Sequence, residues 1–138
     1  MGLNWAAIAL GAIVDIVSST VLGILVIVLA GSLLADSTLS SAELLKQLDA
    51  SPVFVLISSA VGLFCSGLGG YVAGIRTNNR PLLHAAYAAG PSALLNLATL
   101  LGLIEDTQPG WWVAIAMLLS ICASIAGGVY ARERRHRS

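Results

Sequence analysis

Residues 5–34 read WAAIALGAIVDIVSSTVLGILVIVLAGSLL, and the length of this apolar run decides the fold class. A helix needs about 20 residues to cross a hydrocarbon core of ~30 Å at ~1.5 Å per residue. The run exceeds that length, and its one charged side chain is Asp15. It therefore predicts a transmembrane helix that is long enough to tilt or to project beyond the bilayer.

The composition of the whole chain also indicates a membrane protein. Of its 138 residues, 57% are hydrophobic and 10% are charged, and the mean hydropathy is +0.89. Soluble domains carry roughly 25% charged residues. Three further apolar stretches reach spanning length, at 53–75, 81–104 and 110–131. We predict an all-α, polytopic membrane protein with one domain, 1–138, in which four transmembrane helices form a compact bundle and a basic cytoplasmic tail covers 132–138.

A cleaved signal peptide is the alternative for the first stretch. No Lys or Arg precedes the apolar run, however, and the run is longer than the ~7–15 residues of a signal-peptide core. The acidic residue inside it is also atypical of such a core. These features favour a retained helix.

The basic residues predict the orientation, because six of the seven Lys and Arg side chains fall on one side of the four predicted spans. By the positive-inside rule that side is cytoplasmic, and so are both termini. The six are Arg76, Arg80, Arg132, Arg134, Arg135 and Arg137. The opposite loops carry Lys46 and the acidic residues Asp36, Glu43, Asp49, Glu105 and Asp106.

The longer outer loop, residues 35–51, has the pattern of a short amphipathic helix. Ser40 and Glu43 have the spacing of a capping box. One apolar edge follows, formed by Leu44, Leu45 and Leu48. We predict a helix on the outer membrane surface, and the alternative is a solvated loop without a role.

Small and polar residues recur every four positions on all four predicted spans. Such faces let helix backbones approach closely in lipid, where hydrophobic burial contributes little to helix association. We therefore predict that these faces line the contacts between helices. The predicted packing residues are Gly11, Gly23, Gly62, Ser66, Gly70, Gly74, Ser120, Ser124 and Gly128.

The same faces carry a candidate polar site inside the membrane, formed by Asp15, Ser19, His84 and Asn96. A carboxylate at membrane depth costs about 2.5–3.5 kcal/mol on insertion scales, so Asp15 is expected to face the bundle. We predict a contact between Asp15 and His84, with Arg76 or Arg80 as alternative partners. The site is either a structural clamp between helices or a group that responds to protons or cations.

Pro91 predicts a kink in the third span, because it removes a backbone hydrogen bond and crowds the carbonyl of Tyr87. A kink that improves packing is one interpretation, and a broken helix beside a polar cavity, as in transporters, is the other. Cys65 and Cys122 are predicted to be buried packing residues.

No catalytic signature is present: the sequence lacks HExxH, CxxC, Walker A, GxSxG and dinucleotide-binding patterns. We therefore predict a protein that is not an enzyme and has no metal or cofactor. Axial ligation of a tetrapyrrole by His84 is a weaker alternative. The formal net charge of zero gives no indication of a nucleic-acid partner.

The segment GLGGYVAGIRTNNRPLLHAA, residues 67–86, resembles a family of small, uncharacterised bacterial four-helix membrane proteins. These proteins have a GGYxAGR-like end to the second helix and an LLHA-like start to the third. Here Ile75 separates Gly74 from the arginine. The resemblance implies the four-helix fold and the bacterial inner (plasma) membrane, and it implies no activity.

Two functions follow from these patterns. In the first, the chain is a non-enzymatic assembly or accessory subunit whose small-residue faces pack against a second copy or a larger membrane complex. In the second, it is a small oligomeric transporter or channel for protons, cations or small solutes, which uses Asp15, Asn96 and His84. In both, the lipid bilayer is a partner.

Overall fold

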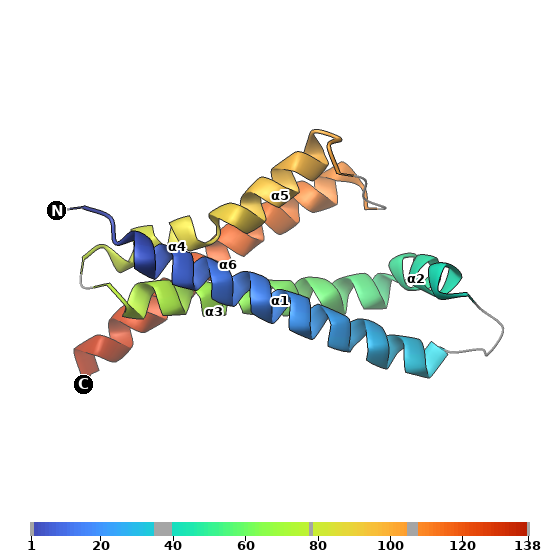
Figure 1. The fold of residues 1–138 in the computed structure, drawn as a ribbon, viewed down its shortest axis with the longest axis horizontal. Coiled ribbons are helices and arrows are strands. Elements are labelled where there is room, and N and C mark those ends of the chain that lie inside the picture. The colour runs from blue at the N-terminus through green and yellow to red at the C-terminus, as the bar shows by residue number, and fades with distance from the viewer. Residues whose placement is uncertain (1, 35–39, 78, 105–107, 138) are drawn as a thin grey trace.

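The computed structural model describes residues 2–34, 40–77, 79–104 and 108–137. All regular secondary structure in these residues is helical, which confirms the all-α prediction. Of the charged loop residues, Asp36, Glu105 and Asp106 lie outside the described part. The helices are α1 (Trp5–Leu34), α2 (Ser41–Asp49), α3 (Pro52–Ile75), α4 (Pro81–Ala88), α5 (Gly90–Leu100) and α6 (Gly110–Arg137) (Figure 1).

Three helices, α1, α3 and α6, are long and apolar enough to cross a membrane. They account for three of the four predicted spans. The fourth, 81–104, is divided into α4 and α5, which have 8 and 11 residues and are each too short to span alone. The residues predicted as a basic tail continue α6 as helix to Arg137.

The division falls at Ala89, two residues before Pro91. Proline has no N–H, and its ring clashes with the carbonyl four residues earlier, so the hydrogen-bond ladder is interrupted there. Pro91 instead occupies the first turn of α5, where a missing N–H costs nothing. The predicted kink is thus confirmed, and α5 turns away from α1 (Figure 1).

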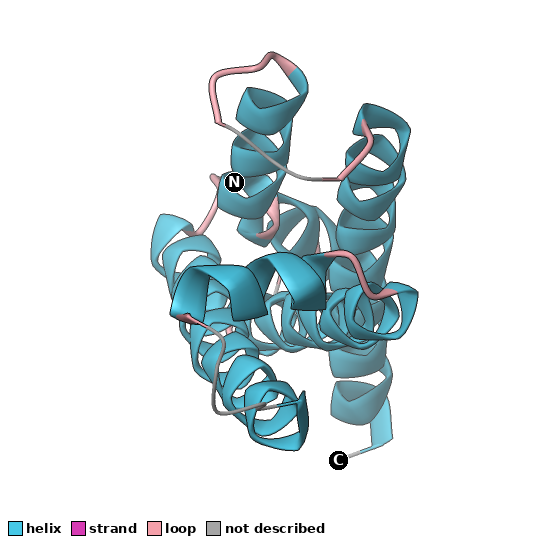
Figure 2. Ribbon diagram, turned by 90° about the vertical axis from the view of Figure 1, so that its right-hand side faces the viewer, coloured by secondary structure: helices cyan, strands magenta, loops and turns pink. Residues whose placement is uncertain are grey.

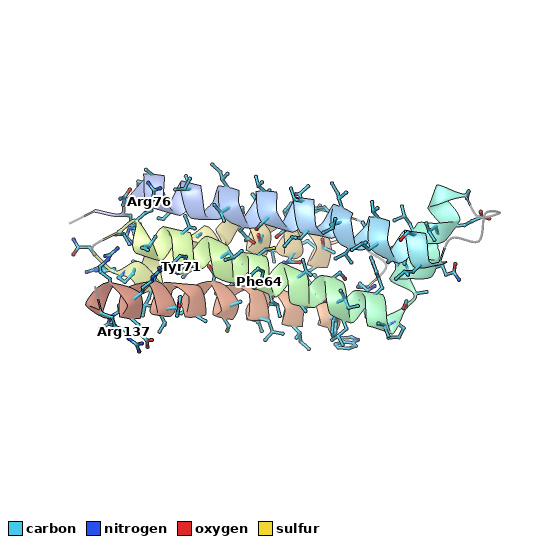
Figure 3. The ribbon with its side chains drawn as sticks, turned by 90° about the horizontal axis from the view of Figure 1, so that it is seen from below. Phe64, Tyr71, Arg76 and Arg137 are labelled. Atoms are coloured by element: carbon cyan, nitrogen blue, oxygen red, sulfur yellow. The ribbon has the colours of Figure 1, made fainter. Side chains whose placement is uncertain are left out.

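The helices are arranged so that both termini and the α3–α4 turn lie at one end of the molecule (Figure 1). We call this the basic end, because the described arginines gather there; Arg76 and Arg137 are labelled in Figure 3. The other end, which we call the α2 end, holds α2 and the connection between α5 and α6. Figure 2 looks onto the α2 end, where α2 lies between the ends of α1 and α3.

Large apolar side chains point outward along the long helices (Figure 3). Phe64 of α3 is 60% exposed, and Val28 of α1 is also 60% exposed. The buried side chains are mostly small, such as Ala73 and Ala85. This distribution suits a protein whose outer surface meets lipid and whose helices pack through small residues.

At the basic end, α3 and α6 pack backbone against backbone. A Cβ atom built on Gly70 would lie 1.9 Å from the carbonyl oxygen of Ser124, and one on Gly127 would lie 2.0 Å from that of Gly67. Neither position has room for any side chain. Gly127 and Gly67 were not among the predicted packing residues.

The opposite side of α3 packs on α1 in the same way. A Cβ on Gly11 would lie 2.6 Å from the carbonyl oxygen of Gly69, and one on Gly69 would lie 2.7 Å from that of Gly11. By contrast, a Cβ on Gly23 or Gly62 would meet nothing within 4 Å. The prediction that Gly23 and Gly62 line tight helix contacts is therefore wrong, because the helices separate toward the α2 end.

The predicted amphipathic helix exists as α2. Ser40 and Glu43 form both hydrogen bonds of the capping box. Leu48 is 1% exposed, and Leu44 faces Gly31 of α1, whereas Leu45 is exposed. The helix therefore packs on both α1 and α3 at this end, and Leu44 and Leu48 are the less exposed of its three predicted leucines.

Candidate functional site

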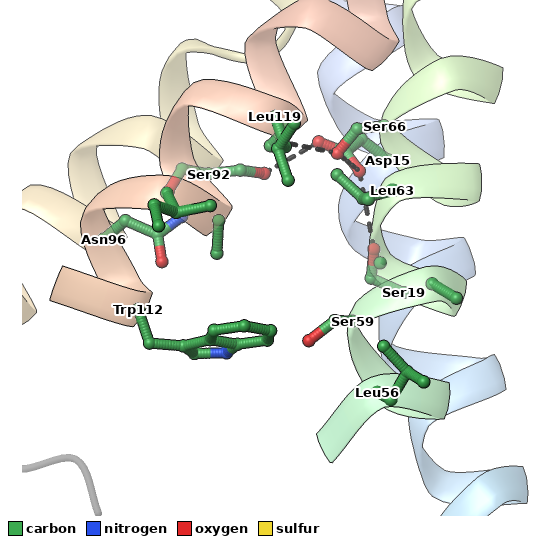
Figure 4. A pocket seen from close by; sticks show the side chains of 15 residues that line it. Asp15, Ser19, Leu56, Ser59, Leu63, Ser66, Ser92, Asn96, Trp112 and Leu119 are labelled. Atoms are coloured by element: carbon green, nitrogen blue, oxygen red, sulfur yellow. Dashed lines mark hydrogen bonds between the residues drawn. The ribbon is translucent and has the colours of Figure 1, made fainter. Parts of the chain in front are cut away.

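Asp15 lies at the centre of the bundle and is 2% exposed. Its Oδ1 accepts hydrogen bonds from the hydroxyl groups of Ser66 at 3.2 Å and Ser19 at 3.4 Å. Its Oδ2 accepts one from Ser92 at 2.7 Å (Figure 4). An ionised carboxylate only accepts hydrogen bonds, so three hydroxyl donors suit it.

A fourth hydroxyl extends this arrangement to α6. The Oγ atoms of Ser66 and Ser120 lie 3.0 Å apart. Because Ser66 donates its one hydrogen to Asp15, the donor of this second bond is Ser120. Asp15 and Ser19 on α1, Ser66 on α3, Ser92 on α5 and Ser120 on α6 thus form one network, which we call the serine cluster.

A cavity of about 320 Å³ adjoins the serine cluster on the side of the α2 end. It separates α1 and α3 from α5 and α6, as Figure 4 shows. Of the described residues that line it, Asp15 alone is ionisable. Ser59 and Asn96 add polar groups farther from Asp15 (Figure 4). The walls are otherwise apolar or small: Leu56, Ala60, Gly62, Leu63, Trp112, Ile115, Ala116 and Leu119.

The two ends of this cavity differ. Toward the basic end, the glycine contacts between α3, α1 and α6 leave no space between the backbones. Toward the α2 end, a second cavity of about 430 Å³ shares Leu56 and Trp112 with the first. Leu56 and Trp112 thus lie between the two cavities, and Asp15 lies at the end of the first cavity that the glycine contacts close.

His84 is separate from Asp15, so the predicted contact between them is wrong. Gly11 is level with Ala88, because a Cβ on Gly11 would lie 3.0 Å from the Cβ of Ala88. One turn further toward the α2 end, Asp15 is level with Ser92. His84 lies one turn from Ala88 in the other direction. Arg76 and Arg80, the alternative partners, are exposed at the basic end.

The ring of His84 has its own partners. Its Nε2 accepts the backbone N–H of Asn4 at 2.8 Å, and its Nδ1 lies 3.0 Å from the carbonyl oxygen of Arg80. These bonds require the neutral tautomer with hydrogen on Nδ1. Both nitrogens are engaged, so in this arrangement neither is available to a tetrapyrrole.

The remaining predicted residues are distributed as follows. Asn96 lines the cavity and donates its amide to the carbonyl oxygen of Ser92 at 3.0 Å. Cys65 is buried, whereas Cys122 is exposed, so the burial predicted for Cys122 is wrong. No group of three or more metal-ligating side chains occurs in the described part of the chain.

The sequence placed Ser66 and Ser120 among packing residues and did not assign them to the site. Their hydroxyl groups could have indicated a role in the site, because both serines lie on the small-residue faces that carry the predicted polar residues. Trp112 was missed altogether, because a tryptophan near the end of a predicted span is typical of the membrane interface.

Comparison of the chain with protein-family models, with curated proteins and with solved structures finds no match. The fold and the site themselves define the class: a helical membrane protein with a buried carboxylate at the end of a mainly apolar cavity.

Proposed function

We propose that the chain is a membrane transporter for a small organic cation, which binds in the cavity beside the serine cluster with Asp15 as its counter-ion. One observation carries this proposal: the only ionisable group among the described cavity residues lies at the closed end of apolar walls. An ionisable group inside the membrane most often marks a substrate or ion pathway.

The walls favour an organic cation over a metal ion. Hard metal cations take six or more oxygen ligands, whereas most of this cavity is lined by carbon. An ammonium group with an apolar body would place its charge at Asp15 and its body against Leu63 and Leu119. Trp112 would supply an aromatic face near the opening, which attracts cations. The volume of about 320 Å³ is at the lower end of the ~300–1,000 Å³ typical of small-molecule pockets.

The proposed membrane arrangement has four crossings, with α4 and α5 together as a broken span. Both termini and the arginines would be cytoplasmic, in a bacterial inner membrane, and α2 would lie on the outer surface. The cavity would then open outward, and the glycine contacts would close it on the cytoplasmic side. Broken spans beside midplane binding sites are common in transporters.

The small-residue faces that favoured an accessory subunit pack within the chain, from Gly11 on Gly69 to Gly70 on Ser124. They therefore explain how the bundle folds and no longer point to an external partner. We propose that the protein works as an oligomer in which each chain holds one such cavity. The proposal assigns no chemical reaction and no cofactor to the site.

A binding experiment tests the role of Asp15. Purified protein in lipid nanodiscs is titrated with benzyltrimethylammonium, and with benzyl alcohol as a neutral probe. We expect Asp15→Asn to weaken binding of the cation at least tenfold, which corresponds to about 1.4 kcal/mol, and to leave the alcohol unchanged. Glu133→Gln removes an exposed acid at the basic end and is the charge-matched control.

The serine cluster offers a second matched pair on α3. Ser66→Ala removes a donor to Asp15, whereas Ser58→Ala removes a hydroxyl that bonds only to its own helix. We expect weaker cation binding in the first variant alone. Equal affinity of the wild type and Asp15→Asn for the cation would refute the proposal. Binding without efflux of the labelled cation from reconstituted liposomes would refute transport and leave a binding protein.

A further inference from the structure

A groove of about 820 Å³ lies at the basic end between α4 and α6, away from the cavity at Asp15. Its surface is apolar along the helices, and exposed arginines border it, one from the start of α4 and one from α6. None of the described residues that line it is acidic. The arginines are Arg80 and Arg132, and the apolar lining includes Leu82, Ala86 and Ile125.

The backbone at Arg80 is a second, independent observation. Its φ of 50° lies in the left-handed region, where it is the one described residue other than glycine. A side chain with a Cβ adopts this conformation at an energetic cost, and glycine or asparagine would fit it better. The carbonyl of Arg80 is nevertheless held firmly, because it accepts the backbone N–H groups of Leu83 and His84 and faces the His84 ring. Residues in such conformations cluster at functional sites.

Next to the groove, α4 and α6 are in close contact. The hydroxyl of Ser124 donates to the carbonyl oxygen of Ala85 at 2.7 Å, and a Cβ on Gly128 would lie 2.6 Å from that of Ala85. The contact between α4 and α6 beside the groove is thus close and fixed by a hydrogen bond. The two arginines are therefore attached to elements that keep their relative position.

We propose that this groove binds one anionic phospholipid, with its headgroup phosphate between Arg80 and Arg132 and an acyl chain along Leu82, Ala86 and Ile125. A guanidinium binds phosphate through paired N–H donors, and its stem packs on apolar surface while its head reaches the interface. Basic pockets between membrane helices on the cytoplasmic side commonly hold anionic headgroups. Lipid binding in this groove is independent of transport through the cavity, and it rests only on the proposed cytoplasmic orientation of the basic end.

Native mass spectrometry of the full chain, released from micelles that contain phosphatidylglycerol and phosphatidylcholine in equal amounts, tests this. We expect a one-to-one adduct with phosphatidylglycerol that is at least tenfold more abundant than the phosphatidylcholine adduct. The double variant Arg80→Gln/Arg132→Gln should lose most of this preference. Glutamine has the same backbone restriction as arginine at φ 50°, so the turn is preserved.

The matched control is Arg76→Gln/Arg137→Gln, which removes the same charge from exposed arginines at the same end. We expect it to keep the adduct within twofold of the wild type. Equal loss in both double variants would overturn the proposal in favour of diffuse attraction. Ala86→Trp fills the groove without changing charge, and an undiminished adduct in this variant would also overturn it. If inorganic phosphate raises the melting temperature as much as phosphatidylglycerol does, the site binds a free anion and the lipid proposal fails.

Discussion

Replacing Gly70 by alanine tests whether backbone contact between α3 and α6 holds the bundle together. The new Cβ would lie 1.9 Å from the carbonyl oxygen and 2.5 Å from the carbonyl carbon of Ser124. Carbon and oxygen atoms that are not bonded stay about 3.2 Å or more apart, so the helices must separate by roughly 1 Å. Both contacted atoms belong to the backbone of α6, so no side-chain rotation can relieve the clash.

The expected cost follows from that geometry. Overpacking a well-packed core costs about 1–3 kcal/mol and occasionally more. Here the separation also shifts Ser124, whose hydroxyl bonds to α4. We therefore expect Gly70→Ala to lower the free energy of unfolding by about 3 kcal/mol, at the upper end of this range.

Gly62→Ala is the control on the same helix, two turns away. A Cβ there meets nothing within 4 Å, and alanine is favoured over glycine in a helix by about 0.8–1.0 kcal/mol. We expect this variant to be as stable as the wild type or slightly more stable. Reversible unfolding in mixed micelles, followed by tryptophan fluorescence and far-UV circular dichroism, measures both. Equal stability of the two variants would refute the close contact of α3 and α6.

Three further predictions concern the ends of the molecule. His84→Phe leaves the backbone N–H of Asn4 without its acceptor and should cost about 1–2 kcal/mol, with faster amide exchange at residues 4–8; unchanged exchange would contradict this. Hydrogen bonds from Ser40 lower the pKa of Glu43 below its ordinary value of 4.5. The capping box should therefore stabilise α2 fully at pH values above 4.5, and this stabilisation should be lost as the pH falls through the lowered pKa. Amide chemical shifts of α2 should show that loss, and Glu43→Gln should abolish its pH dependence. A topology reporter at the C-terminus should read cytoplasmic and one inserted near Lys46 external; the reverse result, or the same side for both, would contradict the four-crossing arrangement.

The helices could be predicted from the sequence because each depends on a local property. The run at 5–34 is predominantly apolar with Asp15 as its one charged residue, and α1 has the same bounds. A kink before α5 was predicted from Pro91 alone, since the missing N–H and the steric clash need no tertiary information, although the span was expected to remain one helix. The capping box at Ser40 and Glu43 is likewise a matter of spacing along one helix.

The site was less predictable because it depends on the axial position of each helix relative to its neighbours. Asp15 and His84 are both polar and both on inward faces, yet Asp15 is level with Ser92, two turns from His84. For the small-residue faces, the sequence likewise did not determine which residues would meet a neighbouring helix. A four-residue spacing winds slowly around a helix of 3.6 residues per turn, so Gly70 meets α6 whereas Gly62 lines the cavity.

Along α3 and α6, the residues that face each other change from glycine at the basic end to larger side chains around the cavity. At the basic end, Gly70 and Gly127 let the two backbones touch, whereas nearer the α2 end Leu56 and Trp112 line the cavity. The bend at Ala89 lets α5 follow α6 and leave α1. Ser66 and Ser120 bond where contact gives way to separation, so the carboxylate of Asp15 is held at the point where the helices diverge. Access to Asp15 from the basic end would require separating the glycine contacts, and Gly70→Ala therefore perturbs the same contact that closes the cavity.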